Sequence, residues 1–170
     1  MTIRREQPAD YESVYQVVKN AFQTAQESDG NEQELVNALR QSVAFIPELS
    51  LVTEINGKII AHILFTKLKI GGHTALALAP LSVLPIYQRQ GIGTSLVQEG
   101  HQITRSLGYS YSVVLGSEKY YPRIGYMPAE KFGIQPCFKV PSKNFMACKL
   151  CENAPIISGI VEYAPEFGIH

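Results

Sequence analysis

The sequence predicts an α/β fold of the α+β kind, with helices packed on a mixed, mostly antiparallel central sheet. Two tight turns, Asn56-Gly57 and Gly71-Gly72, separate three strand-like segments, and both favour two-residue hairpin loops because their residues tolerate positive φ angles. Helical spacing of apolar residues precedes and follows this meander. The run from Tyr109 to Leu115 ends in Val-Val-Leu and is typical of a central strand buried on both faces.

Length and composition indicate one domain. The chain has 170 residues, of which 45% are hydrophobic, and a domain of this size can bury roughly 70% of its unfolded surface. We therefore expect residues 1–170 to form a single domain, with residues 152–170 as a C-terminal extension. Lysine plus arginine and aspartate plus glutamate both number 15, so the bulk charge indicates neither a nucleic-acid nor a membrane partner.

The sequence also predicts a cytoplasmic protein. No apolar run approaches the roughly 18 residues of a transmembrane helix, and the N-terminus, MTIRREQPADYE, lacks the apolar core of a signal peptide. Three cysteines, an odd number, indicate reduced thiols rather than a disulfide framework. Cys148 and Cys151 have CxxC spacing without a second pair or a nearby histidine, so we expect no metal site.

Elements outside the meander follow from the same spacing rules. They are, in chain order, a strand at 2–6, helices at 8–25 and 32–43 with a polar loop at 26–31 between them, a turn of helix at 118–124, a loop with strand at one edge at 136–143, and strands at 145–150 and 156–163. The first of the helices shows the pattern most clearly, since Tyr11, Val14, Val18 and Phe22 recur on one face.

The three meander strands are expected at Leu49–Ile55, Lys58–Ile70 and His73–Leu84. If both turns have two-residue loops, Ile70 pairs with His73, and counting back along the two strands places His62 opposite Leu81. A bulge at Pro80 would move this register.

Pro80 interrupts the third of these strands. Because proline cannot donate to a ladder, it should lie at a bulge or beside an unpaired neighbour, where the strand splays from the next one. Main-chain groups would then be free around Leu81, Ser82 and Val83, and an extended ligand arm that carries amides could pair with them as a false strand.

The loop after this strand opens directly onto a helix expected at Ile92–Leu107. Two glycines let several backbone N–H groups point the same way, and together with the positive end of the helix dipole these groups favour a bound phosphate. The residues expected to hold the phosphate are Gln88, Arg89, Gln90, Gly91, Ile92, Gly93 and Thr94. A pyrophosphate at the loop and an amide-containing arm along the strand describe coenzyme A.

Two motifs stand in a fixed order along the chain. Gln88, Gly91 and Gly93 form Q-x-x-G-x-G between a strand and a helix, and Tyr120–Tyr126 reads YYPRIGY further on. The first resembles the (R/Q)-x-x-G-x-(G/A) cofactor signature, and the second the aromatic-Tyr-x-x-x-Gly-aromatic segment, of the GNAT family of acetyl-CoA-dependent N-acetyltransferases. Within that family the chain is similar to the YhbS-like bacterial predicted acetyltransferases, from the N-terminus to about Tyr163.

This resemblance implies a GNAT fold with helices on both faces of a splayed sheet, acetyl-CoA as cofactor, and transfer of an acetyl group to a primary amine. It implies a small-molecule or protein acceptor, no nucleic-acid or membrane partner, and a monomer or homodimer. In the family the first helices line the acceptor pocket, where Glu27, Asp29, Glu32 and Glu34 could face an amine. An acidic cluster at a helix start also serves for capping and solvation.

Acetyl transfer requires a neutral nucleophile, donors to the oxyanion on the acetyl carbonyl, and a proton for the leaving thiolate. Free amides around Leu81–Val83 would supply the oxyanion donors. The resemblance assigns the general acid to Tyr121, the second aromatic residue of its motif, and a packing position to Tyr120. A phenol, with a reference pKa of about 10, is protonated at neutral pH. The alternative is that both tyrosines pack under a short helix.

The general base is less evident, because no ionisable residue lies on the cofactor strand at 74–84. His73 precedes Leu81 by more than roughly 20 Å of strand, which is too far for it to act there. The candidates are His62 across the ladder, Glu54, an acidic residue of the first helices, or a water that relays the proton. His62 has a suitable reference pKa, whereas a lone histidine in an apolar strand is also typical of a packed core.

The predicted function is direct attack of the amine on acetyl-CoA, without a covalent acetyl-enzyme. The alternative is a regulatory module that binds acyl-CoA and has lost turnover, consistent with the missing base. A nicotinamide-binding Rossmann fold agrees less well, since the third glycine of GxGxxG would fall at Leu96. The acceptor stays open among antibiotic-like amines, polyamines, amino acids, protein lysines or N-termini, and tRNA.

Overall fold

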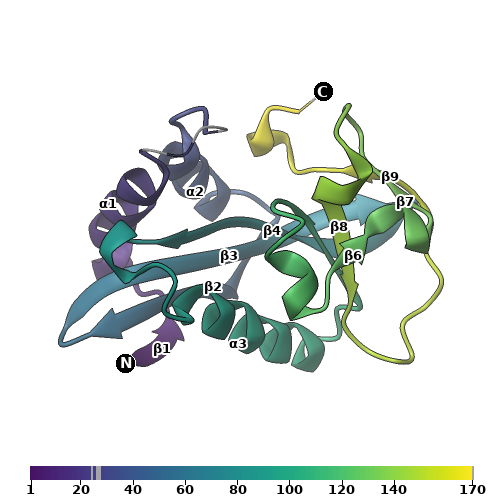
Figure 1. Ribbon diagram of the computed structural model, residues 1–170. Coiled ribbons are helices and arrows are strands. Elements are labelled where there is room, and N and C mark those ends of the chain that lie inside the picture. Colours follow the sequence, from purple (N-terminus) through teal and green to yellow (C-terminus); the bar gives the residue numbers. More distant parts are fainter. Residues whose placement is uncertain (24, 26–27, 170) are drawn as a thin grey trace.

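The fold is built on a sheet whose main path has the strand order β1-β2-β3-β4-β5-β8-β6 (Figure 1). The structure, a computed structural model, describes residues 1–23, 25 and 28–169. The strands are β1 (Thr2–Arg5), β2 (Phe45–Ile55), β3 (Lys58–Ile70), β4 (His73–Val83), β5 (Tyr111–Leu115), β6 (Met127–Pro128), β7 (Ile134–Gln135), β8 (Phe145–Lys149) and β9 (Gly159–Glu162). The helices are α1 (Tyr11–Phe22), α2 (Glu32–Arg40) and α3 (Ile92–Ser106). Short 3-10 turns occur at η1 (Pro8–Asp10), η2 (Pro85–Tyr87), η3 (Tyr121–Ile124), η4 (Ala129–Phe132), η5 (Ser142–Asn144) and η6 (Pro165–Phe167).

The predicted meander of β2, β3 and β4 is confirmed. The Asn56-Gly57 turn, with φ angles of 50° and 78°, connects β2 to β3, and the Gly71-Gly72 turn, at 53° and 87°, connects β3 to β4. Asparagine and glycine adopt these positive angles more readily than other residues, so the sequence fixes where the chain reverses. Ile70 pairs with His73, as expected.

A bulge in β4 changes the register beyond the first half of the strand. Phe65 pairs with Leu78, but Ile63 pairs with Leu81, so β4 carries one extra residue over this span. Pro80 lies inside the span and has no N–H group to donate to the ladder. The bulge that Pro80 predicted is therefore present, and it shifts every later pair by one residue.

This shift decides which face of the sheet each side chain joins. The prediction that His62 lies opposite Leu81 is wrong, since His62 pairs with Ser82. Directly paired residues present their side chains to the same face, and successive residues alternate between faces. His62 and Ser82 therefore share one face, while Leu81 and Val83 lie on the other face and pack against the cluster that includes α3.

The predicted splay between β4 and β5 is also confirmed. In the part of the chain that the structure describes, these strands pair in parallel through Leu76 with Ser112 and Ala77 with Val113, and then diverge. β4 continues to Val83 without a β5 partner. Past Ala77, the backbone groups on this edge of β4 are thus outside any ladder with β5 and available to a ligand.

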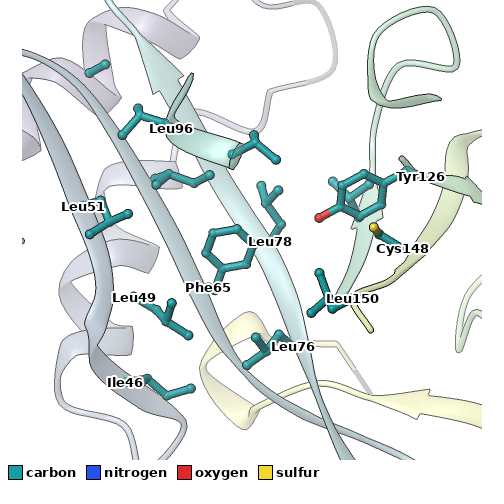
Figure 2. Packing of buried hydrophobic residues seen from close by; sticks show 14 of the residues in the cluster. Ile46, Leu49, Leu51, Phe65, Leu76, Leu78, Leu96, Tyr126, Cys148 and Leu150 are labelled. Atoms are coloured by element: carbon teal, nitrogen blue, oxygen red, sulfur yellow. The ribbon is translucent and has the colours of Figure 1, made fainter. Parts of the chain in front are cut away.

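Helices cover both faces of the sheet, as the resemblance implied (Figure 1). α3 packs on one face, where Figure 2 shows Phe65 in the middle of an apolar cluster that also contains Leu78. α1 and α2 pack on the opposite face against Val52 and Leu64. Within the described residues, no helix has the length and apolar character needed to cross a membrane.

Element boundaries near α1 and α2 differ from those expected. The helix predicted at 8–25 begins as the 3-10 turn η1 and ends at Phe22, and the helix predicted at 32–43 ends at Arg40. The Ser42 hydroxyl accepts a hydrogen bond from the Ala44 N–H at 3.0 Å, which favours a turn over a further helical turn. β2 then starts at Phe45, ahead of the predicted strand.

The C-terminal segment adds a strand to the sheet. β9 pairs with β3 through Lys69–Glu162 and Ile70–Val161, and with β7 in parallel. The strand predicted within 156–163 is thus confirmed over Gly159–Glu162. β6 and β7 span two residues each, which is too short for a periodic pattern, and the sequence did not predict them at these positions.

Gly100 allows α3 to approach the sheet closely. A Cβ atom there would lie 2.3 Å from Cε2 and 2.9 Å from Cζ of Phe65, whose side chain is fully buried. Alanine favours a helix over glycine by about 1 kcal/mol, but overpacking costs about 1–3 kcal/mol, and the cost should be about 2–3 kcal/mol here because the buried ring cannot move away. We expect Gly100→Ala to lower the free energy of unfolding in urea by about 1–2 kcal/mol. The exposed neighbour variant Glu99→Ala should change it by less than about 0.5 kcal/mol, and equal unfolding midpoints would contradict this packing.

Candidate active site

A cleft of about 340 Å³ opens where β4 diverges from β5 and α3 begins. Its walls come from the end of β4, the loop before α3, the first turn of α3 and the segment before η3. The lining residues are Leu81, Val83, Tyr87, Gln88, Arg89, Gly91, Ile92, Gly93, Thr94 and Tyr120. The cleft therefore joins the splayed strand to a helix N-terminus.

The loop before α3 is shaped by two residues with positive φ. Gly91, the residue that caps α3, has a φ angle of 84°, and Arg89 has one of 64°. The Gln88 side-chain amide donates a hydrogen bond of 2.9 Å to the Val83 carbonyl, which fastens the loop to the end of β4. The first N–H groups of a helix have no partner within the helix, so this end of α3 suits an anion.

Gly93 leaves room at the base of the cleft. A Cβ atom on Gly93 would lie 3.1 Å from Oη of Tyr120, 3.5 Å from Cδ2 of Leu81 and 3.7 Å from Cγ2 of Val83. Any side chain here would therefore occupy space between the strand, the helix start and the tyrosine. The vacant position lets a ligand reach the backbone, and so the residues present fit a phosphate group bound at this helix start.

Tyr120 and Tyr121 occupy different environments. The Tyr120 hydroxyl lines the cleft and shares a hydrogen bond of 3.0 Å with Oγ1 of Thr94, although the motif had placed Tyr120 in a packing position. Tyr121 is not among the residues that line the cleft. Its ring lies edge-on to those of Tyr120 and Tyr126, at centroid distances of 5.0 and 5.6 Å. Burial raises the pKa of Tyr121 well above its ordinary value of 10.0, so its hydroxyl stays protonated at neutral pH.

The structure brings together most, but not all, of the residues predicted to bind the cofactor. Ser82 is 1% exposed and faces away from the cleft, and the Gln90 side chain donates to the Ile86 carbonyl at 3.2 Å instead. Tyr87 and Tyr120 line the cleft as well, and the sequence did not place them there. The aromatic pair in YYPRIGY was a signal for Tyr120, whereas Tyr87 stands in an unremarkable turn after Pro85.

The acidic candidates for an amine-facing cluster make hydrogen bonds within the loop before α2 and between α1 and α2. Asp29 accepts a hydrogen bond of 2.9 Å from the Asn31 N–H, the Ser28 hydroxyl donates to Glu32, and the Tyr15 hydroxyl donates to Glu34 at 2.5 Å. None of these contacts is a side-chain cap of α2, whose N-cap residue Asn31 makes no such bond, but each gives the carboxylate a partner within the first helices and the loop between them. Glu27 lies outside the described residues.

The candidate bases lie away from the cleft lining. Glu54 accepts from the Arg4 guanidinium at 3.1 Å. His62 is fully buried on the α1 and α2 face, where Nε2 lies 2.9 Å from Oγ of Ser50. Burial lowers the pKa of His62 from 6.5 to about 4, while the charge of Glu6 acts in the opposite direction.

The chain belongs to the acetyltransferase (GNAT) family, whose model matches residues 11–126. It is similar to two uncharacterised N-acetyltransferases of Escherichia coli K12. YjhQ is 33% identical over 150 residues, which are 85% of this chain and 80% of YjhQ, and YhbS is 29% identical over 170 residues, or 98% of each chain. The family resemblance and the assignment as an acyltransferase are thus confirmed.

Solved structures agree with this assignment. A GNAT family acetyltransferase from Brucella melitensis in complex with acetyl-CoA has a TM-score of 0.81 and 34% identity, covering 98% of this chain and 97% of that one. YhbS from Escherichia coli in complex with CoA has a TM-score of 0.88 and 29% identity, covering 98% and 91%. They confirm the predicted fold and agree with the predicted coenzyme A cofactor.

Buried His62 should make stability depend on pH. Its folded pKa of about 4 lies below the unfolded value of 6.5, so between these values the unfolded chain binds a proton that the folded protein does not. Stability should therefore fall as the pH decreases from 6.5 to 4, by up to about 3 kcal/mol. Burial likewise lowers the pKa of His101 to about 4, which adds to the effect.

Urea unfolding measured at intervals between pH 4 and pH 7 checks this expectation. His62→Gln should reduce the pH dependence of the free energy of unfolding in this window by about half, with His101 responsible for the remainder. His73→Gln, at an exposed position, serves as the control and should leave the slope unchanged. An unchanged slope in His62→Gln would contradict a neutral, buried His62.

Proposed function

We propose that this protein transfers the acetyl group of acetyl-CoA to a primary amine by direct attack. The observation that supports the proposal most strongly is one continuous cleft, lined both by the end of β4 that diverges from β5 and by the N-terminus of α3. One part of this cleft suits an extended amide-containing arm and the other a pyrophosphate. Acetyl-CoA has both groups and supplies an activated acetyl thioester.

In this proposal the pyrophosphate lies on the first amides of α3, with Arg89 adding a positive charge. The pantetheine arm lies along Leu81–Val83, where the edge of β4 has no β5 partner. Backbone N–H groups on the same edge donate to the oxyanion that forms as the amine attacks. These groups are held by the sheet, so they need no reorganisation during the reaction.

The leaving thiolate is protonated by a tyrosine. We assign this role to Tyr121, because it fits the family motif and because its raised pKa means that its hydroxyl carries a proton at neutral pH. Tyr120 is the second candidate, since its hydroxyl already lines the cleft beside Thr94. The two residues are adjacent, and phenylalanine variants distinguish them.

A covalent acetyl-cysteine route has less support. Burial raises the pKa of Cys148 to about 11, so its thiol is protonated at neutral pH and a weak nucleophile. Neither Cys137 nor Cys151 belongs to the lining of the cleft. This chemistry favours direct attack by the amine.

We also propose that residues 1–170 act as one N-acetyltransferase domain in the cytoplasm. The pairing of β9 with β3 ties the C-terminal segment to the central sheet. Cys137, Cys148 and Cys151 are free, as is usual for thiols in a reducing compartment. The acceptor is a small-molecule or protein amine.

The alternative function, a regulatory module that binds acyl-CoA, is favoured by one observation. Among the residues that the structure describes, those that line the cleft include no carboxylate and no histidine that could act as a base. Steady CoA release from acetyl-CoA with any amine of a broad panel would support the enzyme. Tight CoA binding without transfer to any of them would support the module.

Tyr121→Phe removes only a hydroxyl and should lower kcat by about 10²–10⁴-fold while CoA affinity stays nearly unchanged. Tyr120→Phe, the matched control, should lower kcat less and weaken CoA binding slightly, because it loses the hydrogen bond to Thr94. The measurement is CoA release with the fastest amine of the panel. The reverse ranking would assign the acid to Tyr120, and equal, small losses would leave the thiolate without a tyrosine donor.

Gly93→Val should weaken CoA binding by roughly 10- to 100-fold, equivalent to about 1–3 kcal/mol, because the side chain fills the base of the cleft. Isothermal titration with CoA measures the change. Glu99→Val, at an exposed position of the same helix, controls for the β-branched side chain and should bind CoA normally. Normal affinity in a folded Gly93→Val protein would exclude this placement of the pyrophosphate.

A further inference from the structure

A chain of buried polar groups crosses the sheet on the face that α1 and α2 cover. Arg40 donates to Glu6 through Nε at 3.1 Å and through Nη2 at 2.6 Å, and both side chains are buried. The Ser50 hydroxyl donates to Oε1 of Glu6 at 2.9 Å and lies 2.9 Å from Nε2 of His62. These hydrogen bonds thus connect Arg40 of α2, through Glu6 after β1 and Ser50 of β2, to His62 of β3.

The hydrogen bonds fix the tautomer of His62. A guanidinium has only donors, so both oxygens of Glu6 accept, and the single hydrogen of the Ser50 hydroxyl is directed to Glu6. Oγ of Ser50 can then only accept from His62, which requires the hydrogen of the neutral imidazole to be on Nε2. Nδ1 of His62 consequently carries a free lone pair.

Ser82, on the cofactor strand β4, lies beside the end of this chain of polar groups. Nδ1 of His62 and Oγ of Ser82 are both buried, and neither has a hydrogen-bond partner among the residues that the structure describes. The bulge places these two residues directly opposite each other on the same face, where Cβ atoms are about 4.5–5.5 Å apart. The two groups share one face of the sheet without a hydrogen bond between them, and buried polar groups without partners call for a functional explanation.

We propose that Ser82 and His62 form the proton acceptor of the acetyl transfer, with Ser50, Glu6 and Arg40 as positioning residues. This inference rests on the proposed function. As the amine nitrogen bonds to the acetyl carbon, its N–H bond breaks and an O–H bond forms on Ser82. The Ser82 side chain first turns toward Nδ1 of His62. Its original O–H bond then breaks as Nδ1 gains the hydrogen, and the resulting imidazolium is stabilised by Glu6 through Ser50.

The position of Ser82 suits this role. Its neighbours Leu81 and Val83 line the cofactor cleft, while its own side chain points to the α1 and α2 face. The family resemblance places the acceptor near those helices. Ser82 thus links the strand that holds the thioester to the only histidine on the adjoining strand, β3. The desolvated, neutral state of His62 keeps Nδ1 free at neutral pH.

The first test is spectroscopic and requires no acceptor. Long-range ¹H–¹⁵N correlation spectra of the labelled full-length protein at pH 7 should show His62 with a protonated Nε2 and an unprotonated Nδ1. In Ser50→Ala the imidazole loses its Nε2 partner, and we expect a mixture of tautomers. An Nδ1–H tautomer or an imidazolium in the unmodified protein would overturn the relay.

The second test measures turnover as CoA release from acetyl-CoA, with the primary amines of the panel and with water as acceptors. Ser82→Ala should lower it about 10²-fold without loss of stability, because removing a hydroxyl that has no partner costs little. Thr66→Ala removes another buried hydroxyl without a described partner, four positions from His62 on β3, and should keep full turnover.

These outcomes separate the relay from the enzyme. Equal turnover of Ser82→Ala and Thr66→Ala beside an active unmodified protein would overturn the relay and leave the acetyltransferase intact. An unmodified protein that binds CoA but gives no turnover would overturn both. Selective loss in Ser82→Ala together with the Nε2–H tautomer is the result expected.

Discussion

The divergence of β4 from β5 is the constraint on which the rest of the structure depends. Two parallel pairs join the strands, and the bulge around Pro80 then shifts β4 by one residue. Because side chains alternate along a strand, this shift sends Leu81 and Val83 to the cleft beside α3 and Ser82 to the opposite face. One local irregularity therefore supplies free backbone groups, an apolar wall and a link to a buried polar chain.

Features encoded within a few residues could be predicted from the sequence. The Asn56-Gly57 and Gly71-Gly72 turns located the meander, and Pro80 located the bulge and the splay. The glycines before α3 indicated a helix start suited to an anion, and the structure places the start of α3 on the cleft. Each of these signals acts through backbone geometry at its own position, so no knowledge of distant contacts was needed.

Features that depend on distant contacts could not be predicted. Counting along the strands gave His62 the wrong partner, since the sequence indicates a bulge but not the number of residues it adds. The pair of Arg40 with Glu6 joins positions 34 residues apart, and no pattern in either segment connects them. The tyrosine motif likewise named two adjacent rings without showing which hydroxyl would reach the cleft, a choice made by the packing of Tyr121 on Tyr126.

The pairing of β9 with β3 has a consequence for solution behaviour. β2 pairs with one edge of β3 up to the pair of Phe45 with Thr66. Further along the same edge, β9 pairs with Lys69 and Ile70. An uncovered edge there would offer hydrogen-bonding groups to strands of other molecules. β9 thus guards against edge-to-edge aggregation, and shortening the protein at this end would affect its colloidal stability before its chemistry.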